Sequence, residues 1–211
     1  MRIYKITIMD FSAGNLFSIA EALKYFNYDV KITNNSTEIM SSDILILPGV
    51  GAFKTVMKNI KKKRLDIIIE KFINSGKPVV GICLGMQILF EYSYEFKKNK
   101  GLGILEGEVL PFENIIRGQK RNKLNIGWKY INTINTNKIL TKKFDNDNFY
   151  FVHSFYVEPS NKEIISSTSN FYDFKFCSSI NFKNIYAFQF HPEKSGYNGI
   201  KVYKNLSKII K

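Results

Sequence analysis

The first half of the chain alternates short apolar runs with segments of helical periodicity. Three of the apolar runs have the length and alternation of strands: residues 3–8, 29–32 and 43–47. A helical pattern starts at Asn15, a residue type that favours helix caps, and continues through Phe26. Another covers residues 65–74 and is closed by Gly76. Because strands alternate with helices, the pattern predicts a largely parallel sheet with helices on both faces.

The second half is less regular and richer in asparagine and aromatic residues. Its apolar runs predict strands at residues 149–152, 174–180 and 185–190, some of them paired antiparallel, and a closing helix at 197–210. The apolar stripe of that helix, which we expect to pack into the core, consists of Ile200, Tyr203, Leu206, Ile209 and Ile210. We therefore predict a three-layer, flavodoxin-like α/β fold with additional antiparallel strands in the C-terminal half. The chain has no linker-like segment, so residues 1–211 are expected to form a single domain.

Composition and charge change this picture little. The N-terminus reaches Asp10 before a signal-peptide core forms, and no apolar run is long enough to span a membrane, so we expect a cytoplasmic protein without a membrane partner. The net charge of +13 is spread along the chain, with one dense run at residues 61–64. It is accompanied by no basic-aromatic platform or recognition helix, so no nucleic-acid partner is expected. An acidic protein partner would associate faster with such a chain.

The candidate chemistry centres on residues 78–87, a buried strand that turns sharply into a helix with Cys83 at the corner. Gly81 and Gly85 flank the cysteine by two residues on each side, which is the cysteine version of a nucleophile elbow. The start of a helix also favours a thiolate. The alternative is a buried structural cysteine. Because Cys177 is the only other cysteine, at most one disulfide is possible, and we expect Cys83 to stay free.

A nucleophilic cysteine needs a base and a group that orients the base. His191 ends an apolar run, and Glu193 lies two residues further along, where extended backbone would point both side chains the same way. We therefore predict Cys83, His191 and Glu193 as nucleophile, general base and orienting carboxylate. The other histidine, His153, has no carboxylate at this spacing and is interpreted as a pocket residue.

The loop Gly49, Val50 and Gly51 follows the strand at 43–47. Its backbone N–H groups, together with that of Leu84, are predicted to stabilise a tetrahedral oxyanion. As a phosphate loop it lacks the lysine-hydroxyl pair, and an ordinary glycine turn is the remaining alternative. Two histidines and two cysteines at these spacings match no zinc pattern, so no metal site is expected.

Several motifs together resemble the class I (triad) glutamine amidotransferases, most closely the glutaminase subunits of imidazole glycerol phosphate synthases. They cover nearly the whole chain: residues 10–16, 48–53, 81–87, 127–128, 150–154 and 189–196. The resemblance implies hydrolysis of glutamine through a thioester on Cys83, without a cofactor. It also implies a heterodimer with a (β/α)8-barrel synthase subunit, which receives the ammonia and forms imidazole glycerol phosphate in histidine biosynthesis.

The resemblance also implies roles for individual residues. Gln87 and Glu95 would hold the glutamine head. Gly51 and the backbone of His153, Ser154 and Phe155 would line its pocket. Trp128 and Lys194 would face the partner subunit, although Trp128 can also be read as an ordinary core or surface aromatic.

The sequence departs from the family pattern at three places: Ser12 replaces a glycine, Phe155 replaces a tyrosine, and residues 124–129 differ from the usual run before and after the tryptophan. The last change concerns the partner face and therefore the ammonia acceptor. A paralogous subunit that supplies ammonia for amidine formation on a surface sugar remains an alternative. So do a hydrolase of another amide and a non-catalytic scaffold, although the triad residues are all present.

Overall fold

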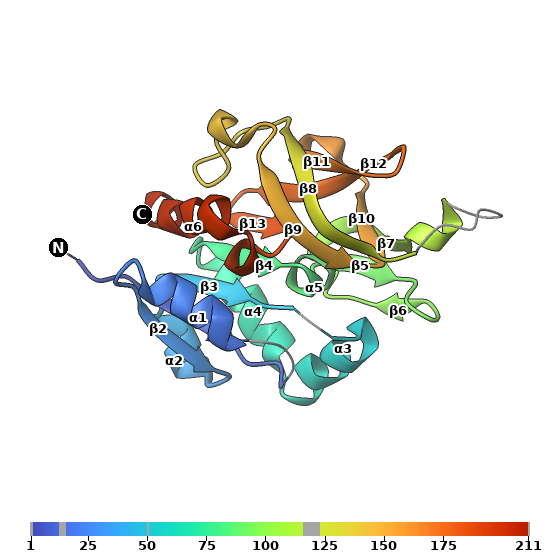
Figure 1. The fold of residues 1–211 in the computed structure, drawn as a ribbon. Helices are drawn as coiled ribbons and strands as arrows, with labels where there is room; N and C mark the ends of the chain where they lie inside the picture. The colour runs from blue at the N-terminus through green and yellow to red at the C-terminus, as the bar shows by residue number, and fades with distance from the viewer. Residues whose placement is uncertain (1, 13–15, 50, 116–122, 211) are drawn as a thin grey trace.

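The computed structural model describes residues 2–12, 16–49, 51–115 and 123–210. Within them, nine strands form one sheet in the order β2-β1-β3-β4-β13-β12-β11-β8-β9, which crosses the middle of the molecule (Figure 1). These strands are β1 (Lys5–Met9), β2 (Asp29–Thr33), β3 (Ile44–Leu47), β4 (Val79–Ile82), β8 (Asn125–Thr133), β9 (Asn148–His153), β11 (Ile165–Phe171), β12 (Phe174–Phe182) and β13 (Ile185–Phe188). The strands from β2 to β13 in this order are parallel, and those from β13 to β9 are antiparallel.

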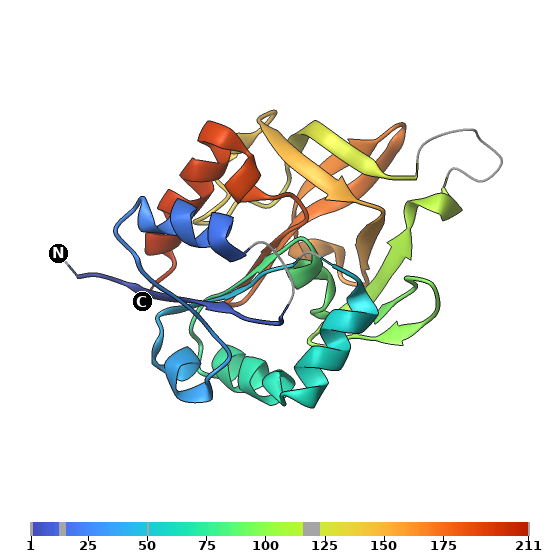
Figure 2. The same ribbon diagram turned by 60° about the horizontal axis from the view of Figure 1, so that its bottom comes forward.

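Helices cover both faces of the parallel part of the sheet. In Figure 2, α1 (Leu16–Lys24) and α6 (Gly196–Lys204) lie side by side on one face, and α2 (Ser36–Ser41), α3 (Phe53–Lys62) and α4 (Leu65–Asn74) lie on the other. This arrangement matches the three-layer α/β fold predicted from the sequence. No helix in the described ranges is both long and apolar enough to cross a membrane.

The central strands are buried on both faces because their apolar side chains alternate between two cores. In β3, Ile44 and Ile46 join the core under α1 and α6, whereas Leu45 and Leu47 join the core under α3 and α4. All four side chains are fully buried. A continuous apolar run is therefore needed in such a strand, rather than an alternation of apolar and polar residues.

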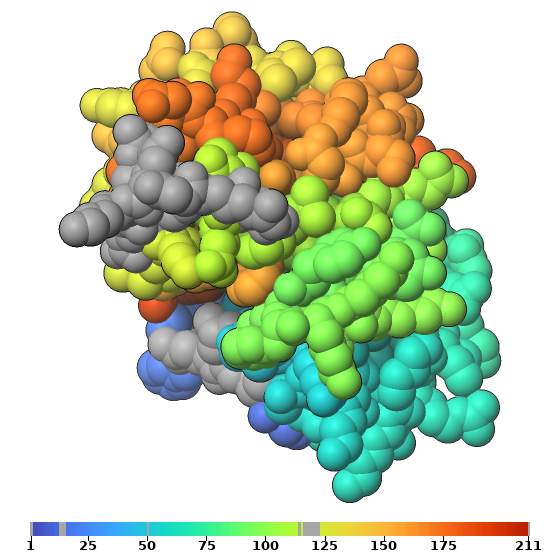
Figure 3. Space-filling view, turned by 90° about the vertical axis from the view of Figure 1, so that its right-hand side faces the viewer, coloured from blue at the N-terminus to red at the C-terminus, as the bar shows by residue number. Residues whose placement is uncertain are grey.

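A second, four-stranded sheet was not predicted. Its order is β10-β7-β5-β6, with β5 at Phe90–Ser93, β6 at Asn99–Lys100, β7 at Leu105–Pro111 and β10 at Phe155–Pro159. The β5–β6 hairpin contacts α3 and crosses the face of the molecule shown in Figure 3. This sheet brings residues from the middle of the chain next to the end of β4.

Several predicted boundaries need correction. The first helix ends at Lys24 rather than Phe26, because Asn27 adopts a left-handed conformation (φ 58°) that stops it. Its proposed cap, Asn15, lies outside the described residues. The closing α-helix ends at Lys204 and tightens into a 3-10 turn, η5 (Asn205–Lys208). Ile200, which was expected in the core, is 39% exposed.

Candidate active site

The turn at Cys83 has the strained geometry expected of an elbow. Cys83 joins β4 to the single helical turn α5 (Leu84–Gln87) with φ 52° and ψ −106°. A Cβ added to Gly85 would lie 1.9 Å from the carbonyl oxygen of Leu47, and one added to Gly81 would lie 2.8 Å from that of Gly85. Both positions require glycine, because backbone from β3 and α5 occupies the space of a side chain.

The short length of α5 changes the electrostatic argument. With four residues, α5 has few aligned peptide dipoles, so its macrodipole contributes less than a full helix would. The local N–H group of Leu84 remains a predicted oxyanion donor. Gly49 and Gly51 line the same pocket as Cys83, whereas Val50 lies outside the described residues.

His191 and Glu193 are joined directly, but not through extended backbone as predicted. β13 ends at Phe188, and Pro192 begins a 3-10 turn, η4 (Pro192–Lys194), because proline suits the first position of a helical turn. The turn brings Glu193 Oε1 to 2.7 Å from His191 Nδ1. Both side chains are almost completely buried, so the pair is shielded from solvent.

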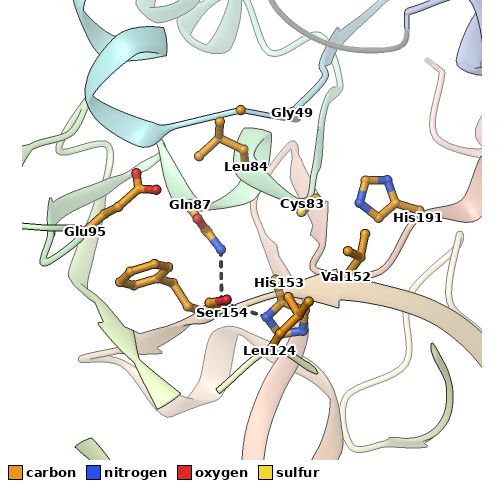
Figure 4. Close-up of a pocket in the computed structure, with 12 residues that line it drawn as sticks. Gly49, Cys83, Leu84, Gln87, Glu95, Leu124, Val152, His153, Ser154 and His191 are labelled. Carbon is orange, nitrogen blue, oxygen red and sulfur yellow. Dashed lines mark hydrogen bonds between the residues drawn. The ribbon is translucent and has the colours of Figure 1, made fainter. Parts of the chain in front are cut away.

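The ring of His191 borders the pocket beside Cys83 (Figure 4), and its second nitrogen is Nε2. Among the described residues, Nε2 has no hydrogen-bond partner of good geometry. Burial lowers the pKa of His191, but the nearby Cys83 and then Glu193 outweigh burial and raise that pKa to about 10. The arrangement therefore favours a charged imidazolium of His191 beside Cys83.

His153 has both ring nitrogens engaged. Nδ1 lies 2.7 Å from the carbonyl oxygen of Phe155 and donates to it, which leaves Nε2 to accept from the Asn125 amide at 2.9 Å. Burial, opposed by the bond to Phe155, lowers the pKa of His153 to about 3. The ring is therefore a neutral part of the pocket wall and has no free nitrogen for Cys83.

The pocket itself has a volume of about 360 Å³. It brings together residues from both sheets and from three connections at the carboxyl ends of β3, β4 and β13. Its lining consists of Gly49, Gly51, Cys83, Leu84, Gln87, Glu95, Leu124, Val152, His153, Ser154, Phe155 and His191. Every described residue that the sequence suggested for the oxyanion loop or the glutamine pocket therefore lies in this lining.

Gln87 is held in the wall by its amide nitrogen. That nitrogen donates to the Phe155 carbonyl oxygen at 3.1 Å, marked in Figure 4, and to the side-chain oxygen of Gln189, also at 3.1 Å. Since both donors are used inside the protein, the amide oxygen of Gln87 is the group left for a ligand. Phe155 contributes its backbone carbonyl to these bonds, so the departure from tyrosine at this position leaves them intact.

Gln189 is a site residue that the sequence did not single out. It is fully buried, and its amide nitrogen donates to Cys83 Sγ at 3.5 Å. The residue lies in the quoted motif 189–196, but its contact with a cysteine 106 positions away depends on the pairing of β13 with β4. Spacing within the motif carries no signal for such a contact.

Glu95 lies at the end of the pocket away from His191 (Figure 4). Its Oε2 accepts a hydrogen bond of 2.5 Å from the backbone N–H of Phe53, the first residue of α3. Burial raises the pKa of Glu95, and the bond from Phe53 partly opposes this effect. Glu95 therefore both borders the pocket and caps the helix that follows Gly51.

Trp128 and Lys194 lie outside the pocket, on an exposed surface. Trp128 is 55% exposed and packs edge-to-face on Tyr150, with ring centroids 6.1 Å apart. Lys194 Nζ lies 5.9 Å from the centre of the Tyr150 ring. Ile126 and Tyr130, which flank Trp128 on the same face of β8, are also exposed. The interpretation of Trp128 as a core aromatic is therefore wrong, and we call these five residues the β8–β9 face.

Ser12 occupies a position where the family usually has glycine, and its local contacts show how serine is accommodated there. It adopts a left-handed conformation (φ 58°), which is where glycine is favoured, and its N–H donates to Asp10 Oδ1 at 2.6 Å. Lys63 Nζ lies 2.8 Å from the Ser12 hydroxyl.

Both cysteines are free and buried. The described part of the chain contains no cluster of three or more His, Cys, Asp or Glu side chains that could hold a metal ion.

Comparison with known proteins agrees with this geometry. The chain is 41% identical over 208 residues to imidazole glycerol phosphate synthase subunit HisH 1 of Methanococcus maripaludis, covering 97% of this chain and 100% of that protein. It is 38% identical over 205 residues to subunit HisH of Aquifex aeolicus, covering 97% and 96%. The solved structure of PurLQS from Thermotoga maritima shares the fold, with a TM-score of 0.75, 16% identity and coverage of 98% and 99%. Residues 7–206 match the model of the glutamine amidotransferase class-I family. The chain therefore belongs to the class-I glutamine amidotransferase family.

Proposed function

We propose that this chain is the glutaminase subunit of an imidazole glycerol phosphate synthase. It would hydrolyse glutamine to glutamate and ammonia and pass the ammonia to a separate synthase subunit, built as a (β/α)8 barrel, in histidine biosynthesis. The observation that carries the proposal is that Cys83, His191 and the predicted glutamine-binding residues line one pocket. The HisH relatives at 38–41% identity support the choice of pathway.

In the first half of the reaction, the Cys83 thiolate attacks the γ-carbonyl carbon of glutamine. The carbonyl oxygen becomes an oxyanion facing the Leu84 N–H and the loop at residues 49–51. The His191 imidazolium gives its proton to the leaving nitrogen, the C–N bond breaks, and ammonia departs from a γ-glutamyl thioester.

In the second half, His191 is neutral and removes a proton from water. The resulting hydroxide attacks the thioester carbon, and the C–S bond breaks, which leaves Cys83 again a thiolate and His191 again an imidazolium. The γ-carboxylic acid that forms releases its proton to solvent and departs as glutamate. Glu193, 2.7 Å from His191 Nδ1, keeps the ring oriented and stabilises its charged form in both halves.

The substrate end of the pocket is suited to an amino acid. Glu95 supplies a carboxylate for the α-ammonium group, and Gln87 supplies an amide oxygen as an acceptor. Gly85 and Gly81 make room for the sharp turn that exposes the sulfur to the pocket. A pocket of about 360 Å³ accommodates a molecule of the size of glutamine.

The β8–β9 face is the proposed contact with the synthase subunit. It presents exposed aromatic side chains, a residue type that is enriched at protein interfaces, and Lys194 lies beside them. The face adjoins the active site, because the Tyr150 carbonyl oxygen accepts the backbone N–H of His191 at 2.9 Å. A partner seated there would lie next to the site where ammonia forms.

The deciding experiment measures glutamate release by the purified chain with and without a (β/α)8-barrel synthase subunit and its ribulosyl ligand. We expect weak activity alone, stimulation by the partner, and no activity in Cys83→Ala. Nitrogen from labelled glutamine should appear in imidazole glycerol phosphate. Transfer of the label to an activated sugar instead, with a matching partner, would replace this proposal by the sugar-amidine alternative. Absence of glutamine hydrolysis with either partner would refute the glutaminase assignment.

A further inference from the structure

The second carboxylate oxygen of Glu193 has a partner on the C-terminal helix. While Oε1 is bound to His191, Oε2 accepts a hydrogen bond from the Tyr203 hydroxyl at 3.3 Å. Tyr203 is 1% exposed, and the side chain of Glu193 is 5% exposed. The contact is therefore made inside the protein, through the carboxylate oxygen that does not bind His191.

The burial of both groups gives this bond its importance. A buried carboxylate or phenol without a partner is costly, so each group satisfies the other. Burial, followed by the charge of Glu193 and the hydrogen bond to it, raises the pKa of Tyr203 well above its ordinary value. The phenol therefore stays protonated and remains a donor at any pH at which the protein works.

The position of Tyr203 is fixed independently of the active site. Its ring belongs to the core between the sheet and α6, and its backbone carbonyl oxygen accepts the hydroxyl of Tyr28 at 3.2 Å. The Tyr28 oxygen in turn accepts the N–H of Ser207 at 3.1 Å. Tyr203 is absent from the pocket lining, and its hydroxyl is linked to the candidate triad through Glu193.

We propose that Tyr203 is a positioning residue, which holds the Glu193 carboxylate in the orientation that aligns the His191 ring with Cys83. Tyr203 then supports the candidate triad of Cys83, His191 and Glu193 from behind the carboxylate, without touching the reacting atoms. This inference rests on the proposed glutaminase function for its kinetic consequence. Its effect on the Cys83–His191 ion pair is independent of the substrate.

The test uses Tyr203→Phe, which removes the hydroxyl and keeps the ring. With partner present, we expect kcat for glutamine hydrolysis to fall about fivefold, the loss typical of one hydrogen bond, with KM unchanged. The rate of Cys83 alkylation by iodoacetamide should also change with pH. Because a Glu193 carboxylate that Tyr203 no longer holds stabilises the His191 imidazolium less well, the acid limb of the alkylation profile should move up by about half a pH unit.

Tyr28→Phe is the matched control. It also removes a buried phenol hydroxyl bound to the C-terminal helix, but this hydroxyl contacts the backbone of Tyr203 and Ser207 rather than Glu193. We expect a lower melting temperature with an unchanged alkylation profile. A loosened C-terminal helix alone would therefore give the result of Tyr28→Phe and leave the acid limb in place.

A double-mutant cycle completes the test. In a Glu193→Gln background, adding Tyr203→Phe should produce no further loss of kcat, because the two groups act as one unit. A wild-type acid limb and kcat in Tyr203→Phe would overturn the proposal, and so would an undiminished fivefold loss in the Glu193→Gln background. Alkylation needs neither glutamine nor partner, so a failure of the wild-type chain to hydrolyse glutamine would count against the proposed function alone.

Discussion

The side-chain amide of Gln189 donates to the sulfur of Cys83 at 3.5 Å from a fully buried position. The same amide accepts through its oxygen from Gln87, which lines the pocket. The nucleophile is thus linked to the pocket wall by two consecutive side-chain amides. A hydrogen bond to sulfur is strongest when the sulfur carries a negative charge, so Gln189 is placed to support Cys83 as the attacking group of the proposed reaction.

Replacing Gln189 by methionine should test this link. Methionine fills a similar volume but cannot donate, and we expect kcat for glutamine hydrolysis to fall by about 10- to 100-fold. The alkylation rate of Cys83 should also fall below that of the wild type. Ser178→Ala, which removes another buried hydrogen bond close to Gln189, is the control and should leave the alkylation profile unchanged. An unaltered profile in Gln189→Met would mean that the amide only fills space.

The glycine at position 85 should not tolerate even a methyl group. In Gly85→Ala, the Cβ would lie 1.9 Å from the Leu47 carbonyl oxygen, and rigid backbone on both sides leaves no room to relax. We expect the free energy of unfolding, measured with urea, to fall by about 3 kcal/mol or more. The control is Gly76→Ala, where φ is +77° but, apart from the two neighbouring residues, no described atom lies within 4 Å of the added carbon. That substitution should cost about 1 kcal/mol of backbone strain.

Two substitutions of Glu95 should separate the effect of its charge on glutamine binding from the effect of its hydrogen bond on the stability of α3. Glu95→Gln keeps an oxygen for the Phe53 N–H but loses the charge, so we expect KM for glutamine to rise about tenfold with little change in melting temperature. Glu95→Ala also removes the cap of α3 and should lower the free energy of unfolding by about 1 kcal/mol in addition. Equal KM values for the Gln variant and the wild type would exclude a role of the charge in binding.

His153 should make the protein sensitive to acid. Its pKa is lowered to about 3 in the folded protein, against an ordinary value of 6.5, so the unfolded chain binds more protons than the folded one between these values. The free energy of unfolding should therefore decrease as the pH falls below 6.5, by about 3 kcal/mol at pH 4. Urea titrations at several pH values measure this slope, and His153→Gln should flatten it. His191 contributes no loss in this range, since its raised pKa gives stability that is complete below pH 6.5 and lost only toward pH 10.

The β8–β9 face should carry much of the affinity for the partner subunit. Trp128→Ala removes a large exposed side chain from its centre, and we expect the dissociation constant to rise by about 30-fold or more. The alkylation profile of Cys83 in the isolated chain should not change. Ile32→Ala is the control, because Ile32 is 44% exposed on β2, at the opposite edge of the sheet from β9. Equal loss in both variants would place the contact elsewhere.

The parallel half of the fold was predictable because its strands are continuous apolar runs and its helices have regular stripes. Residues 65–74 were predicted with the same bounds as α4. Helix α2 was missed although its cap was visible: the Asn35 side chain accepts from the N–H groups of Thr37 and Glu38. Six residues carry too short a periodic pattern to be distinguished from a loop.

The antiparallel part was harder for a different reason. In β8, the apolar side chains Ile126, Trp128 and Tyr130 face solvent, whereas Asn125 is buried against His153. From the alternation of apolar and polar residues along the strand, one would predict that its apolar side faces the core. The strand is exceptional because its outer face is the surface proposed for the partner.

The candidate site was predictable where one short motif contains all the residues that identify it, as at Cys83 with its two glycines. It was not predictable where a contact joins distant segments. Tyr203 was assigned to the core from its place in a helical stripe, and its ring is indeed buried, but its hydroxyl reaches Glu193. Periodicity describes which way a side chain faces and says nothing of the polar atom at its tip.

The placement of β4 between β3 and β13, parallel to both, also bears on how such proteins diversify. The candidate nucleophile Cys83, the predicted oxyanion loop and the candidate base His191 each follow a different strand of this trio, whereas the β8–β9 face lies mainly on the antiparallel side. Mutations that recruit a new partner can therefore accumulate on one half of the sheet while the reaction is conserved on the other. The partner that receives the ammonia can therefore change without any change in the residues that release it.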